Sequence, residues 1–167
     1  MLTRKIAPAL AAGCTVVCKP ANETPLSALI LADYALKAGI PDGVINILCG
    51  KTNEIGETLT ASKDVRKLTF TGSTAVGKKL AADCAKTMKR TTMELGGNAP
   101  FLIFGDADID SAVSGLMASK FRNSGQTCVC ANRILVEDQI YEQFANALKA
   151  ATQKLVIGNG LDSNTSM

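Results

Sequence analysis

The sequence has no histidine and no tryptophan, and only 4% of its 167 residues are aromatic. Without histidine, catalysis by Ser-His-Asp or Cys-His pairs, zinc sites built on paired histidines and histidine proton shuttles are all excluded. Any acid–base chemistry therefore falls to Glu, Asp, Lys, Cys, Tyr or water.

Other absences narrow the class of protein further. No apolar run approaches the roughly 18 residues of a membrane span, and the first residues lack the pattern of a secretory signal. The net charge of +3 is spread along the chain, so we expect neither nucleic acid nor a membrane as a partner. A composition with 47% hydrophobic and 20% charged residues is typical of a globular protein that buries a core.

The six cysteines form no C-x-x-C pair, which excludes zinc-ribbon and thioredoxin sites. Four of them lie in apolar stretches and are expected to be buried, reduced thiols: Cys14, Cys18, Cys49 and Cys84. The other two, Cys128 and Cys130, lie in a polar, glycine-containing loop. We expect a reducing compartment and no metal.

Short apolar runs alternate with helical patterns along most of the chain, which predicts an α/β fold with a parallel sheet. Thr24 is expected to cap a helix that has Pro25 at its first position, and Asp108 to cap another. The expected strands cover residues 14–18, 44–48, 67–71, 91–95, 100–104 and 133–136. The expected helices cover residues 24–39, 53–61, 74–86, 108–121 and 138–155.

A glycine-containing turn follows the expected strand 67–71. Gly72 and Ser73 lie where a parallel sheet binds ligands, and free N–H groups in the first turn of a helix suit a phosphate. The spacing from Gly72 to Gly77 and Lys78 also resembles an NTPase phosphate loop, but Lys79 replaces the Ser or Thr that would hold Mg²⁺. A purely structural reading, close packing of helix on sheet, stays open.

Two further segments carry reactive groups. Glu94 ends a strand just before Gly96-Gly97, and Cys128 lies in a polar loop with Arg122 nearby. A nucleophilic thiolate needs solvent and positive potential, which this loop offers and the apolar runs do not. In the absence of histidine, a carboxylate is the apt proton acceptor.

Four motifs in this order and spacing resemble the aldehyde dehydrogenase superfamily, and the resemblance runs from end to end. They are Lys19-Pro-Ala, Phe70-Thr-Gly-Ser73, Glu94-Leu-Gly-Gly and Gly125-Gln-Thr-Cys128. Within the superfamily, the segments 93–101 and 121–132 are most similar to succinate-semialdehyde dehydrogenases. The resemblance implies a parallel-sheet fold in which residues 1–96 belong to the NAD(P)-binding domain and residues 97–167 begin the catalytic domain.

The resemblance also implies residue roles. Cys128 would attack the aldehyde carbon to give a thiohemiacetal and then a thioester, and its backbone N–H would contribute to the oxyanion hole. Glu94 would be the general base for hydrolysis. The residues implied on the cofactor side are Lys19, Pro20, Ala21, Asn22, Gly72, Ser73, Gly77 and Leu95.

Asn22 gives a prediction about the cofactor. At this position NAD-preferring relatives often have a Glu that binds the ribose 2′-hydroxyl, and a carboxylate there repels a 2′-phosphate. Because Asn22 is uncharged, we expect NADP to be preferred, with NAD possible. Glu23 is adjacent and could reach the same place.

Arg122 and Arg4 are the candidate ligands for the distal carboxylate of succinic semialdehyde, because guanidinium pairs bidentately with carboxylates. A solvated surface charge is the alternative for each. Cys130 is either a small residue leading into the next strand or the partner of Cys128 in a reversible disulfide. A glutarate-semialdehyde enzyme shares the same loop chemistry and stays open.

The resemblance places other parts of the family's site outside these residues, including the Asn that completes the oxyanion hole and a Glu-x-Phe-Gly-Pro segment. We therefore expect little or no turnover from the 167 residues alone, and a non-catalytic fragment is the second hypothesis. A complete enzyme would be a homodimer or homotetramer, cytoplasmic or, in a eukaryote, in the mitochondrial matrix.

Overall fold

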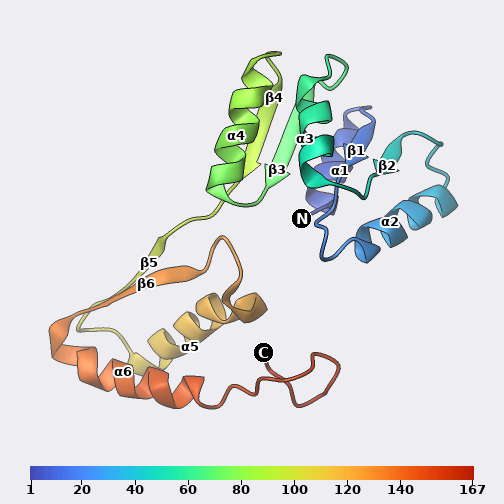
Figure 1. The fold of residues 1–167 in the computed structure, drawn as a ribbon. Helices are drawn as coiled ribbons and strands as arrows, with labels where there is room; N and C mark the ends of the chain where they lie inside the picture. The colour runs from blue at the N-terminus through green and yellow to red at the C-terminus, as the bar shows by residue number, and fades with distance from the viewer. The chain divides into compact units, whose positions relative to one another are not determined.

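The computed structural model describes residues 1–167, which divide into two compact units, Met1–Glu94 and Leu95–Met167. The first unit contains eight elements, shown from blue to green in Figure 1. They are α1 (Thr3–Ala11), β1 (Val16–Cys18), α2 (Leu26–Lys37), β2 (Ile45–Ile47), α3 (Thr52–Ala61), β3 (Lys67–Thr71), α4 (Thr74–Ala85) and β4 (Arg90–Glu94).

The second unit contains two strands, two long helices and a short 3₁₀ turn. They are β5 (Ala99–Ile103), α5 (Ile109–Lys120), η1 (Arg122–Gly125), β6 (Ala131–Val136) and α6 (Asp138–Thr152). Helices α5 and α6 contact β6 and each other, and they lie on the same side of the strand pair (Figure 1). Their buried contacts form a core of Ile103, Val113, Leu116, Ala131 and Phe144.

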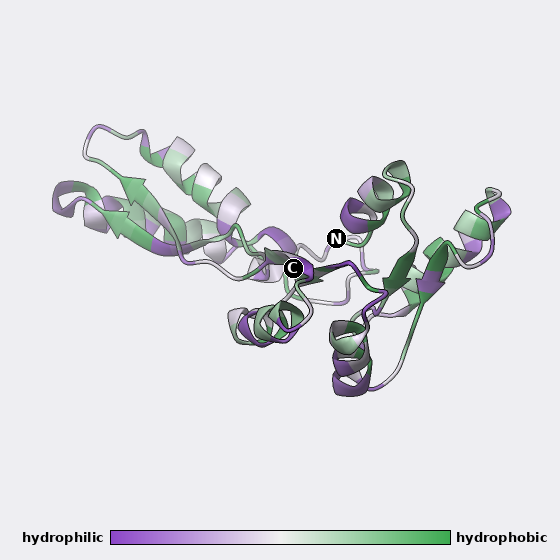
Figure 2. Cartoon of the chain, turned by 90° about the horizontal axis from the view of Figure 1, so that it is seen from above, coloured by the Kyte–Doolittle hydropathy of each residue, from purple (hydrophilic) through white to green (hydrophobic).

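Every strand pair is parallel, which confirms the predicted α/β class. The pairs are β1 with β2, β3 with β4 and β5 with β6. Val16 lies opposite Ile45, and Thr71 lies opposite Glu94. Figure 2 shows apolar residues concentrated along the strands, while the helices mix apolar and polar positions. Alternation of a short apolar run and a helix is what parallel pairing requires, since each pair needs a crossover.

Helix starts follow the predicted chemistry at some places and not at others. Asp108 caps α5, because its side chain accepts a hydrogen bond from the Ser111 amide at 2.8 Å. Ser73 caps α4 through the Val76 amide at 3.4 Å. The predicted Thr24 cap is wrong: α2 begins at Leu26, Pro25 occupies the capping position, and no side chain caps it. The Pro25 carbonyl accepts the first helical hydrogen bonds.

Strand β1 is shorter than predicted and begins at Val16. The Cys14 amide donates to the Ala9 carbonyl instead of a strand partner, so the turn after α1 uses the residues expected to open the strand. Helix α1 is not among the helices predicted from the sequence. None of the helices combines the length and apolar composition that crossing a membrane requires.

Lys89 is a buried side chain that joins two helix ends in the first unit. It is 8% exposed, and its ammonium donates to the Ser62 carbonyl, just after α3, and to the Thr87 hydroxyl, just after α4. The carboxyl end of a helix carries partial negative charge and favours a cation. Lys89 therefore fixes the ends of α3 and α4 together.

Candidate active site

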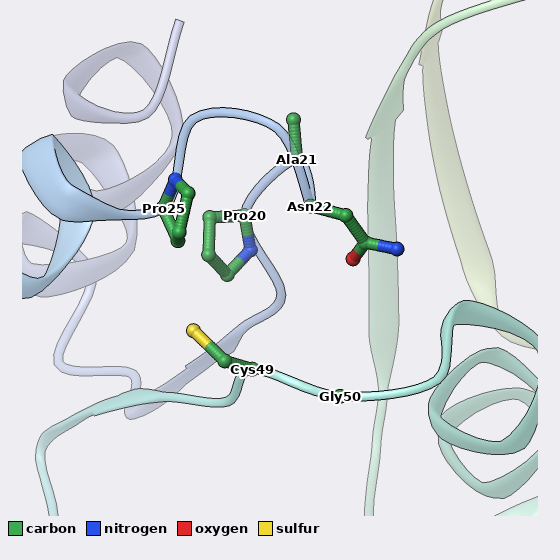
Figure 3. A pocket seen from close by; sticks show the side chains of 6 residues that line it. All are labelled: Pro20, Ala21, Asn22, Pro25, Cys49 and Gly50. Carbon is green, nitrogen blue, oxygen red and sulfur yellow. The ribbon is translucent and has the colours of Figure 1, made fainter.

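A hollow of about 260 Å³ lies among residues that directly follow β1 and β2. Cys49 points toward the two proline rings, and the Asn22 amide points away from them (Figure 3). Parallel sheets bind ligands at the carboxyl ends of their strands, and a mostly apolar lining suits the flat face of an adenine. The lining consists of Pro20, Ala21, Asn22, Pro25, Cys49 and Gly50.

Side chains beside this hollow form a chain of hydrogen bonds. The Lys19 ammonium donates to the Asn22 carboxamide oxygen at 2.6 Å, and the Asn22 NH₂ group donates to the Thr52 hydroxyl at 3.3 Å. The structure therefore brings together two predicted cofactor residues, Lys19 and Asn22, and adds Thr52. The sequence signal that would have found Thr52 is its place at the start of the helix after the neighbouring strand.

The turn between β3 and α4 differs in detail from the prediction. The Gly72 amide donates to the Glu94 carbonyl at 3.1 Å, so this amide is not free for a phosphate. A Cβ on Gly72 would lie 2.4 Å from the Phe70 ring, so glycine here makes room for that ring. The free donors of the turn are the amides of residues 73–75. Gly77 is buried within α4 and donates to the Ser73 carbonyl, which matches the close-packing interpretation.

Glu94 is the last residue of β4 and is half-buried. Its backbone is fixed by pairing with Thr71, and its carboxylate forms no salt bridge. A rigid strand end thus presents an unpaired carboxylate, which can accept a proton. Leu95 opens the second unit and is also half-buried.

Cys128 lies on the loop between η1 and β6 and is exposed. Just before it, η1 ends with three consecutive left-handed residues: Asn123 at φ 50°, Ser124 at φ 56° and Gly125 at φ 76°. Such conformations cost roughly 1–3 kcal/mol each for residues other than glycine, and they persist only where the surroundings impose them. The Cys128 carbonyl also packs against Gly97, where a Cβ would approach it to 3.3 Å.

The following cysteine supports this loop from inside. Cys130 is 1% exposed, and its thiol donates to the Gly125 carbonyl at 3.4 Å. Both Cys128 and Cys130 are free thiols. A disulfide between them would require the Cys130 side chain to leave the interior, so the structure represents the reduced form.

The expectation that four cysteines are buried is only partly correct. Cys84 is buried and Cys18 is half-buried, and burial raises the pKa of both thiols. Cys14 and Cys49 are exposed, which corrects the prediction for them. The reason is local: Cys14 belongs to the turn after α1, and Cys49 lies beyond the end of β2.

The two predicted substrate arginines lie on separate elements. Arg122 opens η1, on the same loop as Cys128 and six residues before it, and is exposed. Arg4 lies in α1 and is also exposed. Neither forms a salt bridge with a carboxylate of this chain, so both guanidinium groups are available to an anionic ligand.

Comparison with known proteins decides the family. The model of the aldehyde dehydrogenase family matches residues 1–167. The chain belongs to the aldehyde dehydrogenase family. The family predicted from the four motifs is therefore confirmed.

Individual relatives are similar over nearly all of this chain. It is 63% identical to mitochondrial succinate-semialdehyde dehydrogenase of rice, 56% identical to succinate-semialdehyde dehydrogenase [NADP(+)] of Escherichia coli and 57% identical to glutarate-semialdehyde dehydrogenase of Pseudomonas aeruginosa. These alignments cover 99–100% of this chain and 32–35% of the relatives. The chain thus spans about a third of the length of the relatives that it matches.

A solved structure shows the same fold. The crystal structure of succinate-semialdehyde dehydrogenase from Burkholderia pseudomallei superposes with a TM-score of 0.98 at 53% identity. The match covers 100% of this chain and 35% of the other. The predicted aldehyde dehydrogenase fold is therefore confirmed.

Proposed function

We propose that these residues form the cofactor-binding and nucleophile-bearing part of an NADP-preferring succinate-semialdehyde dehydrogenase. The observation that carries the proposal is the exposed Cys128 thiol, held on a loop of left-handed residues by the buried Cys130. A thiol used only for packing would be buried, as Cys84 is. The succinate-semialdehyde dehydrogenases among the relatives support the substrate class.

The chemistry assigns one role to each reactive group. The Cys128 thiolate forms a carbon–sulfur bond with the aldehyde carbon, and the substrate is then carried on this sulfur as a thiohemiacetal and as a thioester. The dinucleotide, when bound, supplies the hydride acceptor. Glu94 accepts a proton from the water that hydrolyses the thioester, which frees the acid product and the thiol. A positioned base of this kind contributes typically about 10²–10⁴ in rate.

The cofactor assignment follows from the hollow and its polar edge. Pro20 and Ala21 line a space suited to adenine, and Lys19 with Asn22 offers a cation and a neutral amide at its edge. The donors after β3, around Ser73, suit the pyrophosphate. Leu95 would lie near the nicotinamide carboxamide. The absence of a carboxylate at position 22 favours NADP, and the E. coli relative carries NADP(+) in its name.

The substrate assignment depends on the arginines. Arg122 lies in the segment that carries Cys128, residues 122–130, which we call the nucleophile loop. Arg122 would bind the distal carboxylate of succinic semialdehyde, and Arg4 would contribute from α1. Glutaric semialdehyde is the second candidate, because a glutarate-semialdehyde dehydrogenase is 57% identical over these residues.

A chimera tests the proposal directly. Residues 1–167 replace the matching segment of the E. coli enzyme, and NADPH and NADH formation are followed with succinic and glutaric semialdehyde. We expect activity with succinic semialdehyde and a kcat/KM for NADP above that for NAD by about tenfold. A tenfold preference for NAD would contradict the cofactor assignment, and faster oxidation of glutaric semialdehyde would select the second candidate. The unmodified E. coli enzyme is the control.

A further inference from the structure

Thr52 is the first residue of α3 and lies beside the hollow without lining it. Its hydroxyl oxygen accepts the hydrogen bond from the Asn22 NH₂ group at 3.3 Å. Asn22 in turn accepts from Lys19 at 2.6 Å. These contacts connect the loop after β1 to the helix after β2, so they bridge the two segments that form the hollow.

The direction of these bonds fixes the Asn22 amide. A lysine ammonium has donors only, so the amide oxygen must face Lys19 and the NH₂ group must face Thr52. The second amide N–H and the Thr52 hydroxyl hydrogen have no partner within the chain. The edge of the hollow therefore presents free hydrogen-bond donors and one cation, while the Asn22 oxygen and the Thr52 oxygen each already accept one hydrogen bond.

The charges around this edge also favour an anion. Glu54, in the first turn of α3, pairs with Lys51 at 2.9 Å, which offsets its negative charge. Glu23 is exposed and forms no salt bridge with a residue of the chain, so its carboxylate is the one charge of this segment that opposes an anion. Lys19 forms none either, so its positive charge is not neutralised by a carboxylate.

We propose that Thr52 determines cofactor specificity as a positioning residue. By holding the Asn22 amide with its NH₂ group outward, it creates a donor set for the ribose 2′-phosphate of NADP. A ribose 2′-hydroxyl meets no carboxylate at position 22, and the amide oxygen that remains as an acceptor is already engaged by Lys19. This inference rests on the proposed use of NADP. Without the Thr52 hydroxyl, the Asn22 amide is held only at its oxygen by Lys19, so its NH₂ group is less precisely placed and the distinction between the two cofactors weakens.

Binding of nucleotide fragments to the 167-residue chain tests the inference without any turnover. Isothermal titration calorimetry compares 2′,5′-ADP with 5′-AMP, which differ only in the 2′-phosphate. We expect tighter binding of 2′,5′-ADP by the unmodified chain. Thr52→Val keeps the shape and removes the hydroxyl, and we expect it to weaken 2′,5′-ADP about fivefold to tenfold while 5′-AMP changes less than about twofold. Thr52→Ser should retain the wild-type ratio.

Thr58→Val is the matched control, because Thr58 lies on the same helix and its hydroxyl donates to the Glu54 carbonyl. It should leave the ratio of the two affinities unchanged. An equal loss for both nucleotides in Thr52→Val, or no loss, would overturn the inference while leaving the cofactor assignment intact. An unmodified chain that does not prefer 2′,5′-ADP would instead overturn the proposed use of NADP, and the inference with it.

Discussion

The Cys130 thiol donates a hydrogen bond to the Gly125 carbonyl at 3.4 Å, and it does so from a position that is 1% exposed. This contact joins the end of the nucleophile loop to its left-handed start. Position 125 needs glycine, since its φ is +76° and a Cβ would also approach the Lys120 carbonyl to 3.2 Å. The loop is therefore shaped at its base, while Cys128 stays in contact with solvent.

Replacing Cys130 should loosen this loop. Cys130→Ala leaves the Gly125 carbonyl without its donor, and we expect the loop amides of Gln126 and Cys130 to exchange with solvent about tenfold faster. Cys130→Ser keeps a donor and should exchange much more like the unmodified chain. Hydrogen-exchange mass spectrometry of peptides from residues 121–130 measures this. Equal acceleration by the alanine and serine variants would contradict the role of the thiol, and Cys84→Ala should leave these peptides unchanged.

Lys89→Met should destabilise the first unit by about 2 kcal/mol, because it removes two partly buried hydrogen bonds from a charged donor and leaves the Ser62 carbonyl without this donor. Urea unfolding followed by circular dichroism checks this, since the chain has no tryptophan. Lys78→Met, at an exposed position of α4, should change stability by less than about 0.5 kcal/mol. If the Lys89→Met protein were as stable as the Lys78→Met control, the claim that Lys89 stabilises the ends of α3 and α4 would be wrong.

Asp83 gives the stability a defined dependence on pH. Hydrogen bonds from Lys79 and Lys86 lower the pKa of its carboxyl from 3.8 to about 2. A lowered pKa means that the stabilisation is fully present above the unfolded value near 3.8, and is lost as the pH falls through about 2.

The stability lost in Asp83→Asn should therefore be largest above pH 4 and should shrink as the pH is lowered toward 2. Unfolding curves over this range test the direction. Asp42→Asn, whose carboxylate forms no salt bridge, should show a smaller dependence. If the stability lost in Asp83→Asn instead grew as the pH was lowered, the result would contradict the stabilising role of the Asp83 carboxylate.

Arg122→Leu in the chimera should raise KM for succinic semialdehyde about tenfold, because a bidentate guanidinium–carboxylate contact is lost. Butyraldehyde has no distal carboxylate, so its KM should change little. Steady-state kinetics with both aldehydes measure the difference. Equal changes in both KM values would show that Arg122 does not bind the carboxylate.

The sequence predicted most of the elements because its apolar runs and its cap at Asp108 act locally. It did not predict the exposure of α2, where Leu26 is 70% exposed and Tyr34 62% exposed. This helix is apolar on several sides, so periodicity does not show which side contacts β2. The left-handed conformations of Asn123 and Ser124 could not be predicted from the sequence either, because tertiary contacts impose them against local preference.

In the candidate site too, the sequence predicted the residues that local motifs mark and missed those that only the tertiary structure brings together. Lys19, Asn22 and Cys128 were predicted from motifs, since each lies next to a strand end or in a polar loop. Cys49 lines the hollow from the segment after β2, and Thr52 lies beside the hollow at the start of α3. No motif marks either residue. Their role depends on the parallel pairing of β1 with β2, which the sequence predicts as a class but not strand by strand.

The most direct test of the whole account is the activity of the chimera with Cys128→Ala. NADPH formation from succinic semialdehyde should fall by at least about 10³-fold, because no carbon–sulfur bond can form. Cys14→Ala removes an exposed thiol outside the nucleophile loop and should keep nearly full activity. A Cys128→Ala chimera that oxidises the aldehyde at a rate close to that of the Cys14→Ala chimera would contradict the assignment of Cys128 as the nucleophile.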